Sequence, residues 1–531
     1  MLVSFVSLGR AALRLRRAAA PPVAPWTMLP TPELHQLPPF GDDEAPPGAF
    51  QEGSLEICDD QDDEQRVCEL VKEIFSFRDS AVSNWIVESK VKLLCAEYKC
   101  MRTDSDRDTF LKMLATAYSV DGTKLQEAAR ALLEIDPNDH RGAVKAQEKL
   151  RDQLAPRYHW LFTHMGRLES GVKFLVDLRT QVLDSLAQCK DEVASAALQQ
   201  LNTTLRELLS MWFSVGFLRL ERVTWQSPCD LLQKVSEYEA VHPMRGWTDL
   251  KGRVGLYRRC FMFTHDSMPR EPIVVLHTAL ADTISSSMKG IVTAAQRLSV
   301  DASAAGGLAG LKMAESEENP DLVKAAIFYS ITSTQKGLQG IELGNYLIKR
   351  VVKELRAEFP LVHQFSSLSP IPQFRQWLMD RLKVAKLHTL FTEEEIGNLS
   401  AFMKCPADSA NVRDLLSTNK WLAEYSFVQT MEDPFMRLCA RYLYLEKRRG
   451  FALDSVGNFH LRNGAVMWRL NWRADTTIKG LNNSLGIMVN YRYFLEDAES
   501  NSKSYLEDQC INASDQVLNL AEKAKALMDL P

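Results

Sequence analysis

Apolar residues between positions 65 and 212 recur at the spacing of amphipathic helices. The clearest series forms one helical face near the end of this stretch and consists of Ala194, Ala197, Leu198, Leu201, Leu205, Leu208, Leu209 and Trp212. Turn sequences at Asp121-Gly122 and at 136–139 divide the run. The pattern predicts a bundle of about six to eight helices. Because no residues in it have the spacing of a metal or nucleophile site, a packing or assembly role is favoured.

Beyond residue 213 short apolar segments alternate with helical ones. Five segments rich in β-branched and aromatic residues are predicted strands: 260–264, 273–280, 325–332, 466–472 and 486–495. The first two are joined by a turn-rich sequence, so we expect them to lie side by side. An amphipathic helix is predicted after the third strand, with Leu347, Val351 and Leu355 on its inner face, and another over 513–528.

Composition and charge exclude several classes of protein. The chain has 531 residues, 46% hydrophobic and 25% charged, and a formal net charge of −5. This balance offers no global basic surface for a nucleic acid. No uncharged apolar run approaches the ~18 residues of a membrane span. The ten cysteines contain no C-x-x-C pair, so neither a disulfide scaffold nor a structural metal site is expected.

The charge is distributed unevenly at the N-terminus. Residues 1–32 contain four arginines and no acidic residue, which is typical of a mitochondrial transit peptide. Residues 33–64 contain eleven acidic residues, several prolines and no Lys or Arg, which predicts an extended acidic linker. Met28 follows all four arginines, so initiation there would give a cytoplasmic form without the presequence.

A glycine-rich loop lies between the 325–332 strand and the helix after it. Gly337, Gly340 and Gly344 permit close approach of a ligand to the backbone. A helix beginning near Gly340 would direct free N–H groups at an anion such as a pyrophosphate. The loop matches neither the P-loop nor the G-x-G-x-x-G pattern. The same spacing also fits a strand-to-helix turn that binds nothing.

Three further positions carry candidate chemistry. Ser369 precedes the first of two X-Pro bonds in a loop, and these bonds hold Ser369 and Ile371 out of helical geometry, although an ordinary serine turn has the same pattern. His460 lies beside the Asn463-Gly464 turn, and a lone histidine is more often structural than catalytic. Tyr493 lies in the last predicted strand, where a tyrosine usually packs.

These segments together resemble the malonyl-CoA decarboxylase family. The resemblance runs from about residue 157 to 528, and more loosely back to about residue 65. It rests on long ordered strings: 216–218, 220–225, 227–229, 239–243, 257–260, 340–344, 349–355, 365–372, 458–461 and 490–496. The glycine loop is only loosely similar to the acetyltransferase Q-x-x-G-x-G/A motif, because Gln335, Gly337 and Gly340 are spaced differently.

The resemblance implies an α+β protein. An N-terminal all-α helical bundle over 65–212 would mediate oligomerisation, with a tetramer expected, and a GNAT-acetyltransferase-like α/β catalytic domain would occupy 213–531. It implies conversion of malonyl-CoA to acetyl-CoA and CO2, which controls malonyl-CoA in fatty-acid metabolism, without a metal or organic cofactor. A CoA-dependent acyltransferase of the same fold is the alternative, and it would need a second, nucleophilic substrate.

The resemblance also assigns site residues. Ser369 and His460 match the family's catalytic pair, and Ser330 and Tyr493 match further pocket residues. The coenzyme A loop corresponds to Gln339, Gly340, Ile341, Glu342, Leu343, Gly344 and Asn345. We expect His460, with an ordinary pKa near ~6.5, to protonate the enolate, Ser369 to accept a hydrogen bond, and Tyr493 to orient the pair.

Two positions depart from patterns seen in the family. Some members end in the peroxisomal tripeptide S-K-L, whereas this sequence ends in 528–531 MDLP, which does not support peroxisomal import. Some members carry a second cysteine where this chain has Asp266. Cys229 matches the other cysteine implicated in linkage between subunits, so it is the candidate for an interchain disulfide.

Overall fold

The computed structural model describes residues 60–529 apart from 79, 81, 137, 294–317 and 342. The expected transit peptide, Met28, most of the acidic linker and Glu342 therefore lie outside the described residues. The first helix begins at Asp60, so residues 60–64 are helical rather than part of an extended linker as expected. In the described part of the chain, no helix is long and apolar enough to span a membrane.

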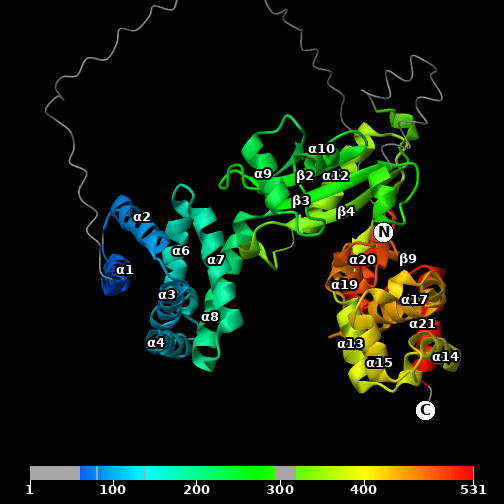
Figure 1. Cartoon of the computed structure of the whole chain (residues 1–531). Coiled ribbons are helices and arrows are strands. Elements are labelled where there is room, and N and C mark those ends of the chain that lie inside the picture. The colour runs from blue at the N-terminus through cyan, green and yellow to red at the C-terminus, as the bar shows by residue number, and fades with distance from the viewer. Residues whose placement is uncertain are drawn as a thin grey trace, which may run out of the picture. The chain divides into compact units, whose positions relative to one another are not determined.

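Among the described residues, eight α-helices precede the first strand. Figure 1 colours this part of the chain from blue to green. The helices are α1 (Asp60–Ser76), α2 (Asn84–Cys100), α3 (Asp104–Ala117), α4 (Gly122–Leu133), α5 (His140–Leu154), α6 (Arg157–Arg167), α7 (Gly171–Gln188) and α8 (Glu192–Trp212). Side-chain oxygens of Thr103, Asp121, Asp139 and Asp191 accept backbone N–H bonds at four of the N-termini. The apolar series on α8 is buried at Leu198, Leu201, Leu205 and Leu208, as its spacing predicts. The number of helices agrees with the prediction.

A mixed sheet follows, with the strand order β1-β2-β3-β4-β5-β10-β6 and β9 paired to β10. Its strands are β1 (Leu218–Val223), β2 (Arg258–His265), β3 (Val274–Ala281), β4 (Ala325–Ser333), β5 (Gln364–Ser367), β6 (Ser369–Pro370), β9 (Val466–Asn471) and β10 (Met488–Tyr493). All five predicted strands are present, and β2 and β3 pair antiparallel as expected. The short strands β1, β5 and β6 are not among the five predicted segments.

The pairing of β4 and β5 opens the sheet at one point. These two strands are parallel and joined by the crossover helix α12 (Gly344–Glu358), which packs on the sheet (Figure 1). They pair only from Ala325 to Phe328, whereas β4 continues to Ser333 beside β3. The chain after β5 turns instead to β10, where Ser369 pairs with Val489. The two strands therefore diverge beyond Phe328 and leave polar strand ends facing a gap in the pairing.

Helices surround the sheet and follow it in the chain. The short η1 (Val215–Phe217) precedes β1. Between β1 and β4 the described helices are α9 (Cys229–Glu237), α10 (Trp247–Arg253) and η2 (Pro320–Leu322), and η3 (Lys336–Leu338) follows β4. After β6 come α13 (Phe374–Val384), η4 (Leu387–Thr389), α14 (Glu393–Met403), α15 (Ser409–Ser417), η5 (Lys420–Ala423), α16 (Tyr425–Thr430), α17 (Glu432–Ala440) and the π-turn η6 (Arg441–Leu445). A short hairpin of β7 (Lys447–Arg448) and β8 (Phe451–Ala452) precedes α18 (Ser455–Arg462). The last helices are α19 (Ile478–Ser484), α20 (Ala498–Asp508) and α21 (Asp515–Met528), which confirms the helix predicted at 513–528.

Candidate active site

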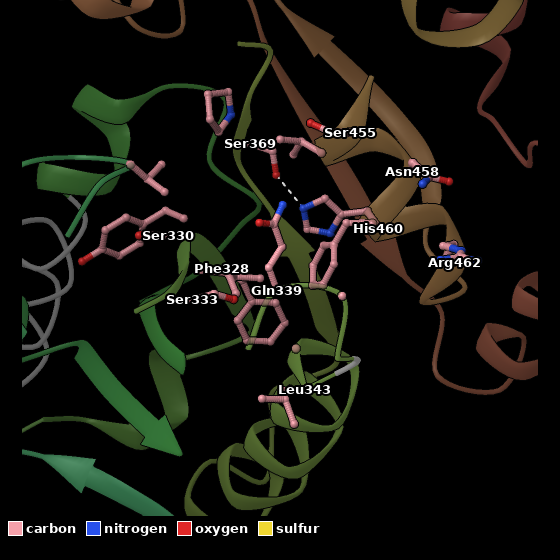
Figure 2. A pocket seen from close by; sticks show the side chains of 18 of the residues that line it. Phe328, Ser330, Ser333, Gln339, Leu343, Ser369, Ser455, Asn458, His460 and Arg462 are labelled. Carbon is pink, nitrogen blue, oxygen red and sulfur yellow. Dashed lines mark hydrogen bonds between the residues drawn. The ribbon is translucent and has the colours of Figure 1, made fainter. Parts of the chain in front are cut away.

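A cavity of about 660 Å³ lies where β4 and β5 diverge (Figure 2). Its walls come from the end of β4, the glycine loop, β6 and α18. The lining residues are Val241, Phe328, Tyr329, Ser330, Ile331, Ser333, Gln339, Gly340, Ile341, Leu343, Gly344, Ser369, Pro370, Ser455, Val456, Asn458, Phe459, His460 and Arg462. Most of the exposed lining is apolar, with a few polar groups, which is the usual composition of a small-molecule site.

Ser369 and His460 meet in this cavity. The Ser369 Oγ lies 2.9 Å from the His460 Nε2, as the dashed line in Figure 2 shows. Ser369 is held by the pairing of β6 with β10, and His460 lies in the last turn of α18. The sequence pattern predicted His460 beside a turn; the structure shows that the turn at Asn463-Gly464 follows a short helix capped by Asp454. The cap fixes where the imidazole projects.

Tyr493 holds the other side of the imidazole. Its hydroxyl lies 2.6 Å from the His460 Nδ1. The Ser369 hydroxyl donates to the Ser367 Oγ at 2.8 Å, so its oxygen accepts from Nε2–H. Nδ1 then accepts from the tyrosine hydroxyl. The described hydrogen bonds thus form one directed chain, Tyr493 to His460 to Ser369 to Ser367, with the proton of the imidazole on Nε2. Tyr493 itself does not line the cavity.

The imidazole is buried and electrically neutral. His460 is only 3% exposed, and the Tyr491 ring stacks on it at 4.6 Å between centroids. Burial lowers the pKa of His460 to about 3, because the charged form would lose its hydration. The expectation of an ordinary pKa near 6.5 is therefore wrong. His460 works as a neutral donor and acceptor.

The glycine loop begins its helix later than expected. Gly340 has φ +80°, a left-handed conformation that favours glycine, and α12 starts at Gly344 rather than near Gly340. A Cβ at Gly344 would lie 2.8 Å from the Phe459 ring, so glycine is needed there to let α12 approach α18. Five residues of the predicted loop line the cavity: Gln339, Gly340, Ile341, Leu343 and Gly344. In Figure 2 the Gln339 side chain extends toward Ser369 and His460.

The other predicted site residues are placed differently. Ser330 lines the cavity, and its hydroxyl donates to both carboxylate oxygens of the buried Glu239 at 2.9 and 2.8 Å. It is not hydrogen-bonded to the Ser369–His460 pair. Asn345 is the second residue of α12, and its side chain lies outside what the structure describes. Cys229 is exposed at the start of α9, outside the cavity.

Several residues that build the site were not predicted from the sequence. Ser367 accepts a hydrogen bond from the Ser369 hydroxyl, and the Tyr491 ring stacks on His460. Asp454 caps the helix that carries His460. The Asp454 signal was present, since an Asp immediately before a helical segment is an N-cap pattern. Ser367 and Tyr491 gave no such signal, because their roles depend on the pairing of β5, β6 and β10.

Comparisons with known proteins agree with this geometry. The family model for the malonyl-CoA decarboxylase C-terminal domain matches residues 216–529, and that for the N-terminal domain matches residues 118–213. The mitochondrial malonyl-CoA decarboxylase of Mus musculus is 48% identical over 78% of this chain and 82% of its own length. Those of Rattus norvegicus and Anser anser anser are 46% and 44% identical over 78% and 80% of this chain, each with 82% of its own length covered.

Solved structures extend the likeness to the fold. The crystal structure of malonyl-CoA decarboxylase from Rhodopseudomonas palustris matches with a TM-score of 0.71 and 28% identity, covering 86% of this chain and 99% of that one. The enzyme from Agrobacterium vitis matches with a TM-score of 0.68 and 28% identity, covering 88% and 100%. The fold is therefore the expected helical region followed by a GNAT-like α+β part. By two family models and by identity over most of its length, this chain belongs to the malonyl-CoA decarboxylase family.

Proposed function

We propose that this protein decarboxylates malonyl-CoA to acetyl-CoA and CO2 and thereby controls the malonyl-CoA available to fatty-acid metabolism. The observation that carries the proposal is the 2.9 Å contact between Ser369 and His460 in a cavity that also contains the glycine loop. The names of the curated relatives, all malonyl-CoA decarboxylases, support it.

The reaction breaks the bond between the carboxylate carbon and C2 of the malonyl group. CO2 leaves, and the bonding electron pair becomes a thioester enolate. A neutral donor aimed at the thioester oxygen stabilises that developing charge. In this site two donors are available: the Nε2–H of His460, which donates to the Ser369 oxygen, and the hydroxyl of Ser369, which donates to Ser367. Substrate entering between them would exchange their mutual hydrogen bond for bonds to its own oxygens.

The neutrality of His460 suits the loss of CO2. An imidazolium would bind the malonyl carboxylate as an ion pair and stabilise the substrate before reaction, whereas catalysis requires stronger interaction in the transition state. Burial keeps the pKa of the imidazole low and the ring uncharged. Phe328, Pro370 and Val456 add apolar surface around the cavity, where a carboxylate is poorly solvated and CO2 is not disfavoured.

The enolate carbon then takes up a proton. A thioester enolate is a stronger base than imidazolate, so the neutral imidazole can give up its Nε2–H proton, and a proton from solvent then restores the ring. We propose that the enolate's proton comes from His460 Nε2–H, with Ser369 next to it as acceptor and relay, while the Tyr493 hydroxyl holds Nδ1. Glycine-loop N–H groups bind the coenzyme A diphosphate.

One assay tests the proposed reaction. Purified protein is mixed with malonyl-CoA and no acyl acceptor, and acetyl-CoA and CO2 are both measured. Equal amounts of the two products are expected. An acyltransferase would leave malonyl-CoA intact until an amine or alcohol acceptor is added, which would overturn the proposal. Because the thioester itself accepts the electron pair, we propose that no metal or organic cofactor takes part, and prior dialysis against EDTA should leave the rate unchanged.

We propose that the protein acts in the mitochondrial matrix. The curated relatives are mitochondrial by name, and the arginine-containing, acid-free residues 1–32 support import. A shorter cytoplasmic form beginning at Met28 is part of the same proposal. N-terminal sequencing of the protein from each cellular fraction tests both, since unprocessed Met1 in mitochondria would contradict the presequence.

We further propose that the chain assembles as a tetramer and that Cys229 can link two subunits. The exposure of Cys229 supports the second part. Light scattering of the purified protein gives the oligomeric state. Nonreducing electrophoresis of wild type and Cys229→Ser tests the link, and a dimer band that persists in the variant would contradict it.

A further inference from the structure

The glycine loop contacts helix α7 of the N-terminal helical region. Gly337 lies so close to α7 that an added Cβ would collide with the Val176 carbonyl oxygen. Lys336, next to it, forms an ion pair with Asp184 of the same helix. The loop that lines one wall of the cavity is therefore supported from outside the sheet.

Arg179 makes the strongest of these contacts. It projects from α7, is 2% exposed, and its Nη1 and Nη2 donate to the carbonyl oxygens of Gly337 and Gln339 at 2.6 and 2.9 Å. Its Nε donates at 3.0 Å to Asn202 Oδ1 of α8. A planar guanidinium can hold two carbonyls and a side chain in fixed directions at once, which a lysine cannot do.

Peptide planarity carries this contact to the cavity. In a trans peptide the C=O and the N–H of one unit point in opposite directions. The Gln339 carbonyl points at Arg179, so the N–H of Gly340 points away from α7. Gly340 lines the cavity, and among the described residues its N–H has no hydrogen-bond acceptor. The left-handed φ of Gly340 then turns the chain toward α12.

We infer that Arg179 is a positioning residue that aims the Gly340 N–H at the diphosphate of coenzyme A, so that the helical region sets the affinity of the active site for the nucleotide part of its substrate. This inference rests on the proposed use of a CoA thioester. On this inference, the glycine loop takes part both in the substrate cavity and in the contact with the N-terminal helical region. Arg179 touches neither the reacting atoms nor the cavity.

The experiment compares two substrates in Arg179→Lys and wild type. Malonyl-CoA carries the diphosphate, whereas malonyl-pantetheine ends before it and keeps the reacting thioester. We expect the KM for malonyl-CoA to rise about 10-fold or more, the factor that corresponds to one lost charge-assisted hydrogen bond, with kcat within about threefold. The KM for malonyl-pantetheine should stay within about twofold. Asn202→Ala, which removes only the support of Nε, should give a smaller rise with the same selectivity.

Arg141→Ala is the matched control, because it removes an exposed arginine from α5. Equal losses with both substrates would overturn the inference, since they would mean general loss of packing or misplacement of the Gln339 side chain near the reacting centre. Unchanged kinetics with both substrates would also overturn it.

A binding measurement separates this inference from the proposed reaction. Calorimetric titration with CoA alone should show at least about 10-fold weaker binding to Arg179→Lys than to wild type and to Arg141→Ala. If wild type binds CoA but releases no CO2 from malonyl-CoA, the reaction is wrong and the inference is still decided by this titration. Equal CoA affinity in all three proteins would overturn the inference even if the reaction is correct.

Discussion

Tyr491 and Tyr493 contact the same imidazole in different ways. The Tyr493 hydroxyl donates a hydrogen bond to His460 Nδ1 at 2.6 Å, whereas the Tyr491 ring stacks on the imidazole. The buried hydroxyl of Tyr491 has no hydrogen-bond partner among the described residues. Substitutions at these two tyrosines can therefore test the hydrogen bonding of His460 separately from its packing. Strand β10 places both.

We predict that Tyr493→Phe lowers kcat by about 10- to 100-fold with little change in KM. The ring remains, but the hydroxyl that fixes the proton of His460 on Nε2 is gone, and contributions of positioned proton-transfer groups are of this order. Steady-state kinetics with malonyl-CoA provide the measurement. Tyr491→Phe is the control and should keep kcat within about threefold, because it removes an unpaired hydroxyl. Equal effects of the two variants would contradict the directed chain of hydrogen bonds.

The pH dependence of turnover tests the neutrality of His460. Since burial lowers its pKa to about 3, we expect kcat to show no step between about pH 6.5 and 8.5. Asp454, whose pKa burial raises to about 6, is the group expected to titrate just below that range. The profile should therefore be measured in wild type and in Asp454→Asn. A step centred near pH ~6.5 that persists in the variant would show that His460 titrates and would contradict a neutral imidazole.

At the scale of elements, α18 and the divergence of β4 from β5 build the site. The positions of the main strands could be predicted, because apolar β-branched runs such as 325–332 are buried on both faces. The short helix α18 could not, since Asn458 to Leu461 lacks a helical repeat long enough to recognise. The meeting of Ser369 with His460, 91 positions apart, depends on register between β6 and β10. From the residues alone only candidates were available, and the family resemblance paired them.

The cap of α18 leads to a prediction about stability. The carboxyl of Asp454 has a pKa of about 6 in the folded protein against an ordinary value of 3.8, so the folded form holds its proton more tightly. Stability from this group is then present at low pH and is lost as pH rises from about 4 through 6, by about 2 to 3 kcal/mol in total. Asp454→Asn keeps a capping oxygen without that loss.

Urea unfolding at pH 5 and pH 8 checks this expectation. Relative to wild type, Asp454→Asn should be more stable at pH 8 than at pH 5 by about 1.4 kcal/mol, the part of the loss that falls between these two pH values. Asp408→Asn, an exposed N-cap of α15, is the matched control and should show no such difference. If the free energy of unfolding of wild type exceeds that of Asp454→Asn at pH 8 by more than at pH 5, the protein stabilises the buried carboxylate in its charged form, which would contradict the prediction.

At the scale of the whole molecule, the helical region and the sheet meet at the glycine loop through Arg179. A ligand on that loop should therefore stabilise both parts. We predict that CoA at 100 times its dissociation constant adds about 2.7 kcal/mol to the free energy of unfolding. We also expect CoA to slow hydrogen exchange in α7 as well as in α12. Slower hydrogen exchange in α12 alone would contradict the expectation that CoA stabilises both the helical region and the sheet.

The central claim is that Ser369 and His460 together perform the decarboxylation. Its most direct test is the kcat of Ser369→Ala for CO2 release from malonyl-CoA, with CoA affinity measured on the same preparation. Ser455→Ala, which removes another hydroxyl from the same cavity, is the control. The account predicts that Ser369→Ala lowers kcat by at least about 100-fold while CoA affinity stays within about threefold and the control remains active. Near-normal turnover of Ser369→Ala would contradict it.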